Sequence, residues 1–106
     1  MSKKLITRPT VYYAHAKHIY HTAEEKKQLE HIKRKFPDHI ILNPRDHQDY
    51  PQDDVMGYYK KLVGSCDRVV FSRLAGKITA GVGVEVNHAL SLGMQVHELT
   101  LSSLSL

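Results

Sequence analysis

Short apolar runs alternate with longer amphipathic stretches along the chain. The runs at 10–14, 39–42, 67–72 and 94–99 are rich in β-branched, aromatic or other apolar residues, which predicts four strands. Between them lie three segments whose apolar residues recur every three or four positions, as expected of helices packed on one face. Strict alternation of strand and helix predicts a parallel sheet with the helices as crossovers.

Residues that favour helix ends bound the predicted helices. Thr22, with Glu25 three positions later, forms a capping-box pattern before the first helix, and Pro37 ends that helix. Asp53 or Asp54 is the expected N-cap of the second helix. The third helix is predicted over 81–92, and the glycine that follows it suits a C-cap.

Right-handed crossovers and this element order predict a small doubly wound, flavodoxin- or Rossmann-like α/β fold. We expect four to five parallel strands in the order 2-1-3-4, with helices on both faces of the sheet. Ligands in such sheets bind at the carboxyl ends of the strands, where the strand order reverses. The loops after Ala14 and Phe71 are therefore expected to form a site. Residues 100–106 could be a fifth strand, a packed tail or a dimer contact.

Small residues open the third predicted helix directly after the loop that follows the third strand. Thr79, Gly81 and Gly83 are candidates for binding an anion, because backbone N–H groups and the positive end of the helix dipole meet there. The spacing is not the dinucleotide fingerprint, since Val86 stands where its third glycine would be, and no P-loop lysine follows. Close packing of the helix on the strand explains the glycines equally well.

A carboxylate, Glu85, follows in the same helix. Its proximity to the candidate anion site suggests a ligand that carries a phosphate and an electrophilic carbon a few ångströms apart; a favourable charge near a helix N-terminus is the alternative. In the loop after the first strand, His15, Lys17 and His18 are candidate phosphate ligands. His15, His18 and His21 recur every three positions, but no carboxylate or cysteine lies near them in sequence, so we expect no metal. We also expect no cofactor.

Length and composition indicate one globular domain, residues 1–106. Apolar residues make up 42% of the chain and charged residues 25%. No apolar run approaches the ~20 residues of a membrane span, and the N-terminus lacks the apolar core of a signal peptide. Cys66 is the single cysteine, which excludes an internal disulfide and suits a reducing compartment. We therefore expect a cytoplasmic protein that does not enter membranes.

The formal charge of +4 is concentrated in two basic clusters, residues 3–8 and 26–35. Nucleic-acid binding is one interpretation of such clusters. Glutamates interleave with the lysines of the second cluster and no nucleic-acid-binding motif is present, so we favour a solvated helix face and, for residues 1–9, a flexible basic tip. A mildly positive protein also suits a small anionic ligand, and we rank nucleic-acid binding last.

Together these motifs resemble the nucleoside 2-deoxyribosyltransferase superfamily, which includes the 2-deoxynucleoside 5-monophosphate N-hydrolases. Similarity covers most of residues 10–99. It is carried by the first strand at 11–14, the asparagine-proline at 42–44, the aspartate-initiated strand at 67–71, the small-residue stretch at 79–85 and the alanine-containing helix and strand at 88–96.

The resemblance implies a mechanism. Glu85 would attack the anomeric carbon of the sugar and displace the base, and water or a second base would resolve the glycosyl-enzyme. Tyr12 would orient Glu85. Thr79 supplies a hydroxyl where the monophosphate hydrolases carry a serine that contacts the 5-phosphate, which favours a nucleotide monophosphate as substrate. Asn43 joins the candidate substrate-binding residues.

One departure from the family pattern opens an alternative. Tyr59 stands where the family carries an aspartate that helps to protonate the leaving base. We therefore expect an N-glycosidase acting on a (deoxy)nucleoside 5-monophosphate, or alternatively a module on the same fold that binds a nucleotide or sugar phosphate without turnover. The resemblance also implies a homodimer.

Overall fold

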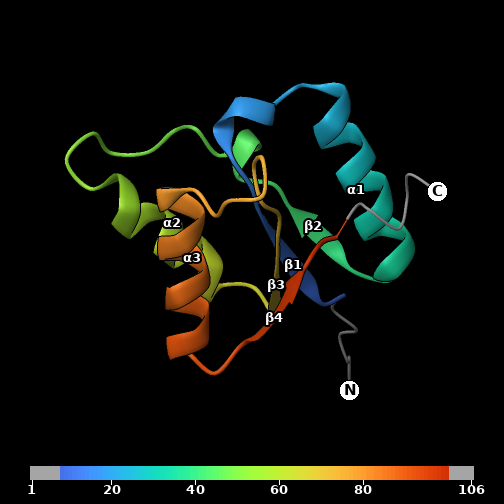
Figure 1. Cartoon of the computed structure of the whole chain (residues 1–106). Coiled ribbons are helices and arrows are strands. Elements are labelled where there is room, and N and C mark those ends of the chain that lie inside the picture. Colours follow the sequence, from blue (N-terminus) through green and yellow to red (C-terminus); the bar gives the residue numbers. More distant parts are fainter. Residues whose placement is uncertain (1–7, 101–106) are drawn as a thin grey trace, which may run out of the picture.

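Four parallel strands form one sheet in the order β2-β1-β3-β4, as predicted. The strands are β1 Thr10–Ala14, β2 Ile40–Leu42, β3 Arg68–Phe71 and β4 Gln95–Glu98. The structure is a computed structural model that describes residues 8–100 (Figure 1). The predictions for the C-terminal tail and for most of the basic tip concern residues 1–7 and 101–106, which lie outside the described residues. The strand order reverses between β1 and β3, and the sequence predicts the site at this point.

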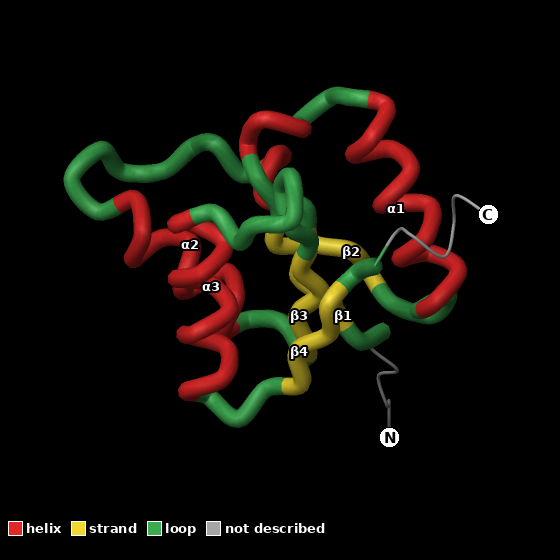
Figure 2. Tube along the Cα trace, viewed as in Figure 1, coloured by secondary structure: helices red, strands yellow, loops and turns green. Residues whose placement is uncertain are grey.

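Among residues 8–100, three α-helices cover the sheet. They are α1 Ala23–Lys35, α2 Val55–Gly64 and α3 Ala80–Ser91, and two short 3-10 helices, η1 Lys17–Ile19 and η2 Pro44–Asp46, lie in the loops after β1 and β2. Helix α1 lies on one face of the sheet, and α2 and α3 lie side by side on the other (Figure 1 and Figure 2). The predicted doubly wound arrangement, with helices on both faces, is confirmed.

Alternation of side chains along β1 divides the core into two halves. Tyr12 packs with Val69 and Val82 on the face covered by α2 and α3. Tyr13 packs with Ile32 on the face covered by α1. Neighbouring residues of a strand point to opposite faces, so these consecutive buried tyrosines serve different layers. This orientation directs the phenol of Tyr12 toward α3.

Helix caps set where the helices begin. The Asp54 side chain accepts a hydrogen bond from the Gly57 N–H, so Asp54 rather than Asp53 caps α2. The Thr22 hydroxyl accepts from the Glu25 N–H at 3.2 Å, which is half of the predicted capping box. In a full capping box the Glu25 carboxylate would accept a hydrogen bond from the Thr22 N–H. Here the carboxylate accepts from the His21 N–H instead.

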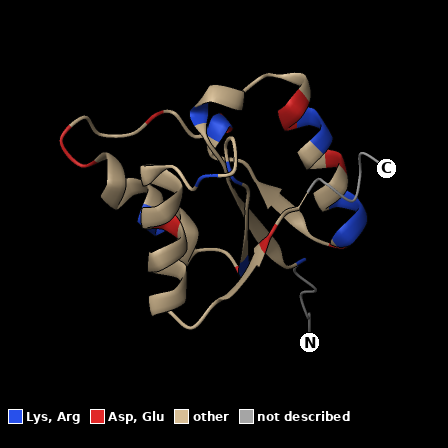
Figure 3. Ribbon diagram, viewed as in Figure 1, with Lys and Arg blue, Asp and Glu red and all other residues tan. Residues whose placement is uncertain are grey.

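Two further predictions are refined by the described residues. Arg8 was assigned to a flexible tip, yet its guanidinium donates to the carbonyls of Asp38 and His39. Basic and acidic residues are interspersed along α1 (Figure 3), which agrees with a solvated helix face. Between residues 8 and 100, no helix has both the length and the apolar character needed to cross a membrane.

Candidate active site

A cavity of about 300 Å³ opens at the carboxyl ends of β1 and β3. Its walls come from the segment after β1, from the first turns of α2 and from the start of α3. Its described lining residues are His15, Ala16, Lys17, His18, Tyr20, Val55, Met56, Tyr59, Thr79, Gly81 and Glu85. These three chain segments meet here because the crossover connections leave a crevice where the strand order reverses.

Glu85 lies at the inner end of the cavity. Its side chain is buried, the residue being 6% exposed, and its Oε2 accepts a hydrogen bond from the phenol of Tyr12. Burial raises the pKa of Glu85 to about 7, against the smaller opposing effects of the Tyr12 hydrogen bond and the positive charge of Lys17. Near neutral pH this carboxyl group therefore exists in both protonation states.

Tyr12 is a fixed, neutral donor. Burial and the nearby charge of Glu85 raise its pKa far above the usual value for a tyrosine. Because Tyr12 is fully buried on the central strand, its hydroxyl has little freedom to leave the carboxylate. The pair joins two rigid elements, β1 and α3, and so fixes one carboxylate oxygen.

The start of α3 forms the second part of the site. Thr79, the residue before α3, lines the cavity, and within the described chain its hydroxyl makes no capping hydrogen bond to the helix. Gly81 also lines the cavity. Gly83 does not: its N–H donates to the Thr79 carbonyl at 2.8 Å. The prediction that Gly83 holds phosphate directly is therefore not supported, because its N–H is engaged in the helix.

Lys17 and His18, on η1, are exposed at the rim of the cavity. The Lys17 ammonium lies 5.4 Å from the centre of the Tyr50 ring, in cation–π contact. Their placement is compatible with the predicted phosphate contact. Over residues 8–100, no group of three or more His, Cys, Asp or Glu side chains is arranged to hold a metal ion.

His15 has a different role from the one predicted. Its Nδ1 donates to the Tyr13 carbonyl at 2.9 Å and its Nε2 lies 2.8 Å from Glu25 Oε2. The imidazole stacks on the Tyr13 ring, with centroids 3.6 Å apart. Burial lowers the pKa of His15, against the opposing effect of these hydrogen bonds. With both nitrogens engaged, His15 lines the cavity but is not free to bind phosphate.

Asn43 also departs from the prediction. Its Oδ1 accepts from the Arg45 N–H at 2.9 Å and so caps η2. The side chain is buried and does not belong to the cavity lining. Asparagine ends β2 because its side chain can satisfy the first free N–H of the short helix that follows. We therefore assign Asn43 to the support of the loop after β2.

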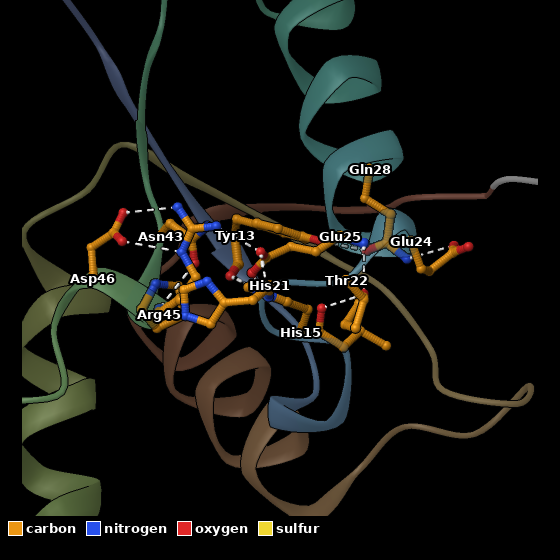
Figure 4. A network of polar contacts seen from close by, with 12 residues as sticks. Tyr13, His15, His21, Thr22, Glu24, Glu25, Gln28, Asn43, Arg45 and Asp46 are labelled. Carbon is orange, nitrogen blue, oxygen red and sulfur yellow. Dashed lines mark hydrogen bonds and ion pairs between the residues drawn. The ribbon is translucent and has the colours of Figure 1, made fainter.

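A buried polar network centred on Glu25 supports the loop that carries Lys17 (Figure 4). Glu25 is 1% exposed and accepts from Arg45 Nη1 at 2.7 Å and from the His21 N–H at 3.0 Å, besides its contact with His15. Burial alone would raise the pKa of Glu25, but these partners outweigh it and the pKa is lowered. The sequence indicated only a helix cap, because Arg45 lies 20 positions away.

An aromatic and apolar wall faces the inside of the cavity, formed by Tyr20, Tyr59, Val55 and Met56. The Tyr59 hydroxyl donates to the His47 carbonyl at 3.2 Å and accepts from the Gln48 amide at 3.3 Å. Sequence reasoning did not assign Tyr20, Val55 or Met56 to the site. The connection after η1 places Tyr20 there, and the loop between η2 and α2 places Val55 and Met56. Loop paths leave no periodic pattern in a sequence.

The fold is similar to that of a solved enzyme. A 2-desoxiribosyltransferase from Leishmania mexicana superposes with a TM-score of 0.62 at 17% sequence identity, over 86% of this chain. The chain spans 63% of the length of that enzyme's chain. No protein-family model matches the sequence, and no curated protein matches it either. At this identity the similarity shows a shared fold.

Proposed function

We propose that this protein is an N-glycosidase that cleaves the base from a (deoxy)nucleoside 5-monophosphate. The single observation that carries the proposal is the Tyr12–Glu85 pair, buried at the inner end of a cavity whose rim presents Lys17. A buried carboxylate destabilises the fold unless it is paired, and Glu85, unlike Glu25 with its Arg45 partner, forms no ion pair among the described residues. The shared fold with a 2-desoxiribosyltransferase adds support, since that protein's name describes transfer of a desoxyribosyl group.

In the proposed reaction, the phosphate lies at the start of α3. The Thr79 hydroxyl and the Gly81 segment contact it, and Lys17 and His18 contribute positive charge at the rim. The sugar then lies between the phosphate and Glu85. Ionised Glu85 attacks the anomeric carbon, held in line by Tyr12, and the base departs toward the aromatic wall. Water then releases the sugar phosphate and regenerates the carboxylate.

Base release from a panel of nucleoside monophosphates tests this proposal. Chromatography after incubation with the wild-type protein should show free base, and the Glu85→Gln variant should show none, because the amide keeps the shape but is not a nucleophile. Absence of product from every monophosphate would overturn it.

One observation favours binding without turnover. Tyr59 stands where the resemblance places an acid, and its hydroxyl is already engaged with His47 and Gln48. A thermal-shift measurement separates the two functions. Stabilisation by a nucleotide, unchanged in Glu85→Gln and without product, would identify a binding module.

The homodimer and the cytoplasmic location stay predictions. Static light scattering of the purified chain distinguishes a monomer of 12.1 kDa from a dimer. Leu90 and Leu92 of the α3 end are exposed and would be the first positions to mutate if a dimer is found.

A further inference from the structure

The chemistry available beside Glu85 is unusual for the cleavage of an ordinary nucleobase. Among the described residues that line the cavity, Glu85 is the one carboxylic acid. If it serves as nucleophile, it cannot also protonate the leaving base in the same step. Tyr59, the nearest counterpart of the expected acid, donates its proton to the His47 carbonyl. The described lining thus offers a carboxylate nucleophile but no second carboxylic acid to protonate the base.

How readily a base leaves depends on the charge that it carries once the C1′–N bond has broken. A neutral base leaves as an anion unless an acid protonates it, and a positioned acid contributes ~10²–10⁴-fold to such a reaction. A base bonded through a quaternary ring nitrogen, in contrast, already carries a positive charge. Cleavage of its C1′–N bond yields a neutral molecule, and no protein acid is needed.

The walls of the cavity also suit a cation. Tyr20 and Tyr59 line the space next to Glu85, and an aromatic face attracts a positive charge placed within ~6 Å of its centre. Burial raises the pKa of both phenols, so the rings stay neutral. A neighbouring ring already binds one cation: Tyr50, whose ring centre lies 5.7 Å from that of Tyr59, is in contact with the Lys17 ammonium.

Charge and size point to the same ligand. Lys17 lies at the rim and Glu85 at the inner end, so the cavity is positive at one end and negative at the other. A ribonucleotide with a 5-phosphate and a cationic base carries its charges in the complementary order. The volume of about 300 Å³ is at the lower limit for ligand pockets and fits one nucleotide better than two.

We propose that the substrate is an N-ribosyl 5-phosphate whose base is a permanently cationic heteroaromatic ring. This rests on the proposed N-glycosidase function and narrows it to one class of substrate. Two sources share the chemistry: pyridinium nucleotides and purine nucleotides alkylated at N7. Both present a flat cationic ring to Tyr20 and Tyr59 and leave as neutral bases.

The reaction balances without an added acid. In the first step a Glu85 oxygen bonds to C1′, and the C1′–N electron pair passes to the ring nitrogen, which leaves uncharged. In the second step a water oxygen bonds to C1′ and the ester electron pair returns to Glu85. One proton of the water passes to solvent.

Two matched pairs of substrates test the inference. Nicotinamide mononucleotide is compared with its reduced, uncharged dihydro form, and 7-methylguanosine 5-monophosphate with guanosine 5-monophosphate. Each kcat/KM is divided by the spontaneous cleavage rate of the same compound. The expected result is release of base from at least one cationic member, with an enhancement roughly 100-fold or more above that of its neutral partner. The pair whose cationic member releases base shows whether the substrate is a pyridinium nucleotide or a purine nucleotide alkylated at N7.

Variants of one aromatic residue provide the second readout. Tyr20→Leu should raise KM for the cationic substrate by ~2- to 30-fold and change KM for a neutral monophosphate less, whereas Tyr20→Phe keeps the ring and should stay within ~2-fold of wild type. Equal losses for charged and neutral substrates would contradict the cation-binding role and point to general packing.

The possible failures are distinguishable. Release of base from neutral monophosphates with equal or greater enhancement would overturn the inference and leave the N-glycosidase proposal standing. If neither pair releases base while other monophosphates are cleaved, the inference is likewise overturned and the N-glycosidase proposal stands. No release from any monophosphate would overturn both.

Discussion

The phenol of Tyr12 donates a hydrogen bond to Oε2 of Glu85 and joins the central strand to α3 across 73 positions of sequence. Both side chains are buried. The tyrosine lowers the pKa of the carboxyl group, whereas burial raises it more strongly, and the result is about 7. The same contact therefore controls the position of the carboxylate and the fraction of it that is ionised.

Tyr12→Phe should shift the pH profile of base release. In wild type, kcat/KM should rise with pH through about 7 as Glu85 ionises. Loss of the hydrogen bond removes an effect that lowers the pKa, so the rising limb should move to higher pH and activity at pH 7 should fall, by roughly ten-fold or more. A pH–rate profile from 5 to 9 measures both. An unchanged limb would show that another group controls ionisation.

Glu85→Gln should stabilise the fold at high pH. The folded-state pKa of Glu85, about 7, lies above the usual glutamate value of 4.5, so its contribution to stability is full below pH 4.5 and is lost as pH rises through about 7. Glutamine keeps an acceptor for Tyr12 without a buried charge. We expect the variant to be more stable than wild type by about 1–3 kcal/mol at pH 8, and close to wild type at pH 5. Urea unfolding at both pH values tests this, and equal differences at both would contradict it.

The sequence was sufficient to predict the sheet and its layers. Strand and helix periodicities extend over whole elements, so β1 and α3 could be placed. Consecutive residues of a strand point to opposite faces, and the structure shows this for Tyr12 and Tyr13. Because those faces are fixed, the meeting of Tyr12 with Glu85 could be anticipated from topology together with the resemblance.

The supporting contacts could not be predicted in the same way. Glu25 has the spacing of a helix cap, and its burial depends on where the loop after β2 places Arg45. His15 and Asn43 carry polar atoms that suit a ligand equally well in sequence. The structure engages them with Glu25 and with the Arg45 N–H, contacts that depend on loop paths rather than on periodicity.

Thr79→Val should separate phosphate binding from helix stability. The Thr79 hydroxyl makes no capping bond among the described residues, so its removal should leave the free energy of unfolding within ~0.5 kcal/mol of wild type. If the hydroxyl binds phosphate, KM for a nucleoside monophosphate should rise by ~10-fold or more, as expected for a hydrogen bond to a charged group. KM for the nucleoside without phosphate should not change.

Thr22→Val is the matched control for that experiment. Thr22 does cap its helix, accepting from the Glu25 N–H, so this variant should lose about 1 kcal/mol of stability. Equal stability losses in the two variants would show that Thr79 also has a structural role.

Glu25→Gln should weaken the fold by removing the charge at the centre of the buried network. The amide oxygen can still accept from the His21 N–H, but Arg45 would lose its charged partner on α1 and keep only Asp46, so we expect a loss of about 1.5–3 kcal/mol at pH 7. The lowered pKa of Glu25 gives stability that is present above 4.5 and is lost as pH falls through the folded-state pKa, so the variant and wild type should converge in acid. Glu24→Gln, one position away on the helix surface, should cost less than ~1 kcal/mol.

Lys17→Met should change both KM for a monophosphate and the pH profile of base release, because it removes one positive charge from the cavity. Lys17 lies at the rim of the cavity, and its positive charge lowers the pKa of Glu85. Removing the charge should raise KM for a monophosphate and reduce the salt dependence of kcat/KM, because the attraction to phosphate is screened by ions. It should also move the rising limb of the pH profile to higher pH. Lys26→Met, an exposed lysine of α1 outside the cavity lining, should alter neither the limb nor KM, and a shift in that control would assign the effect to net charge rather than to Lys17.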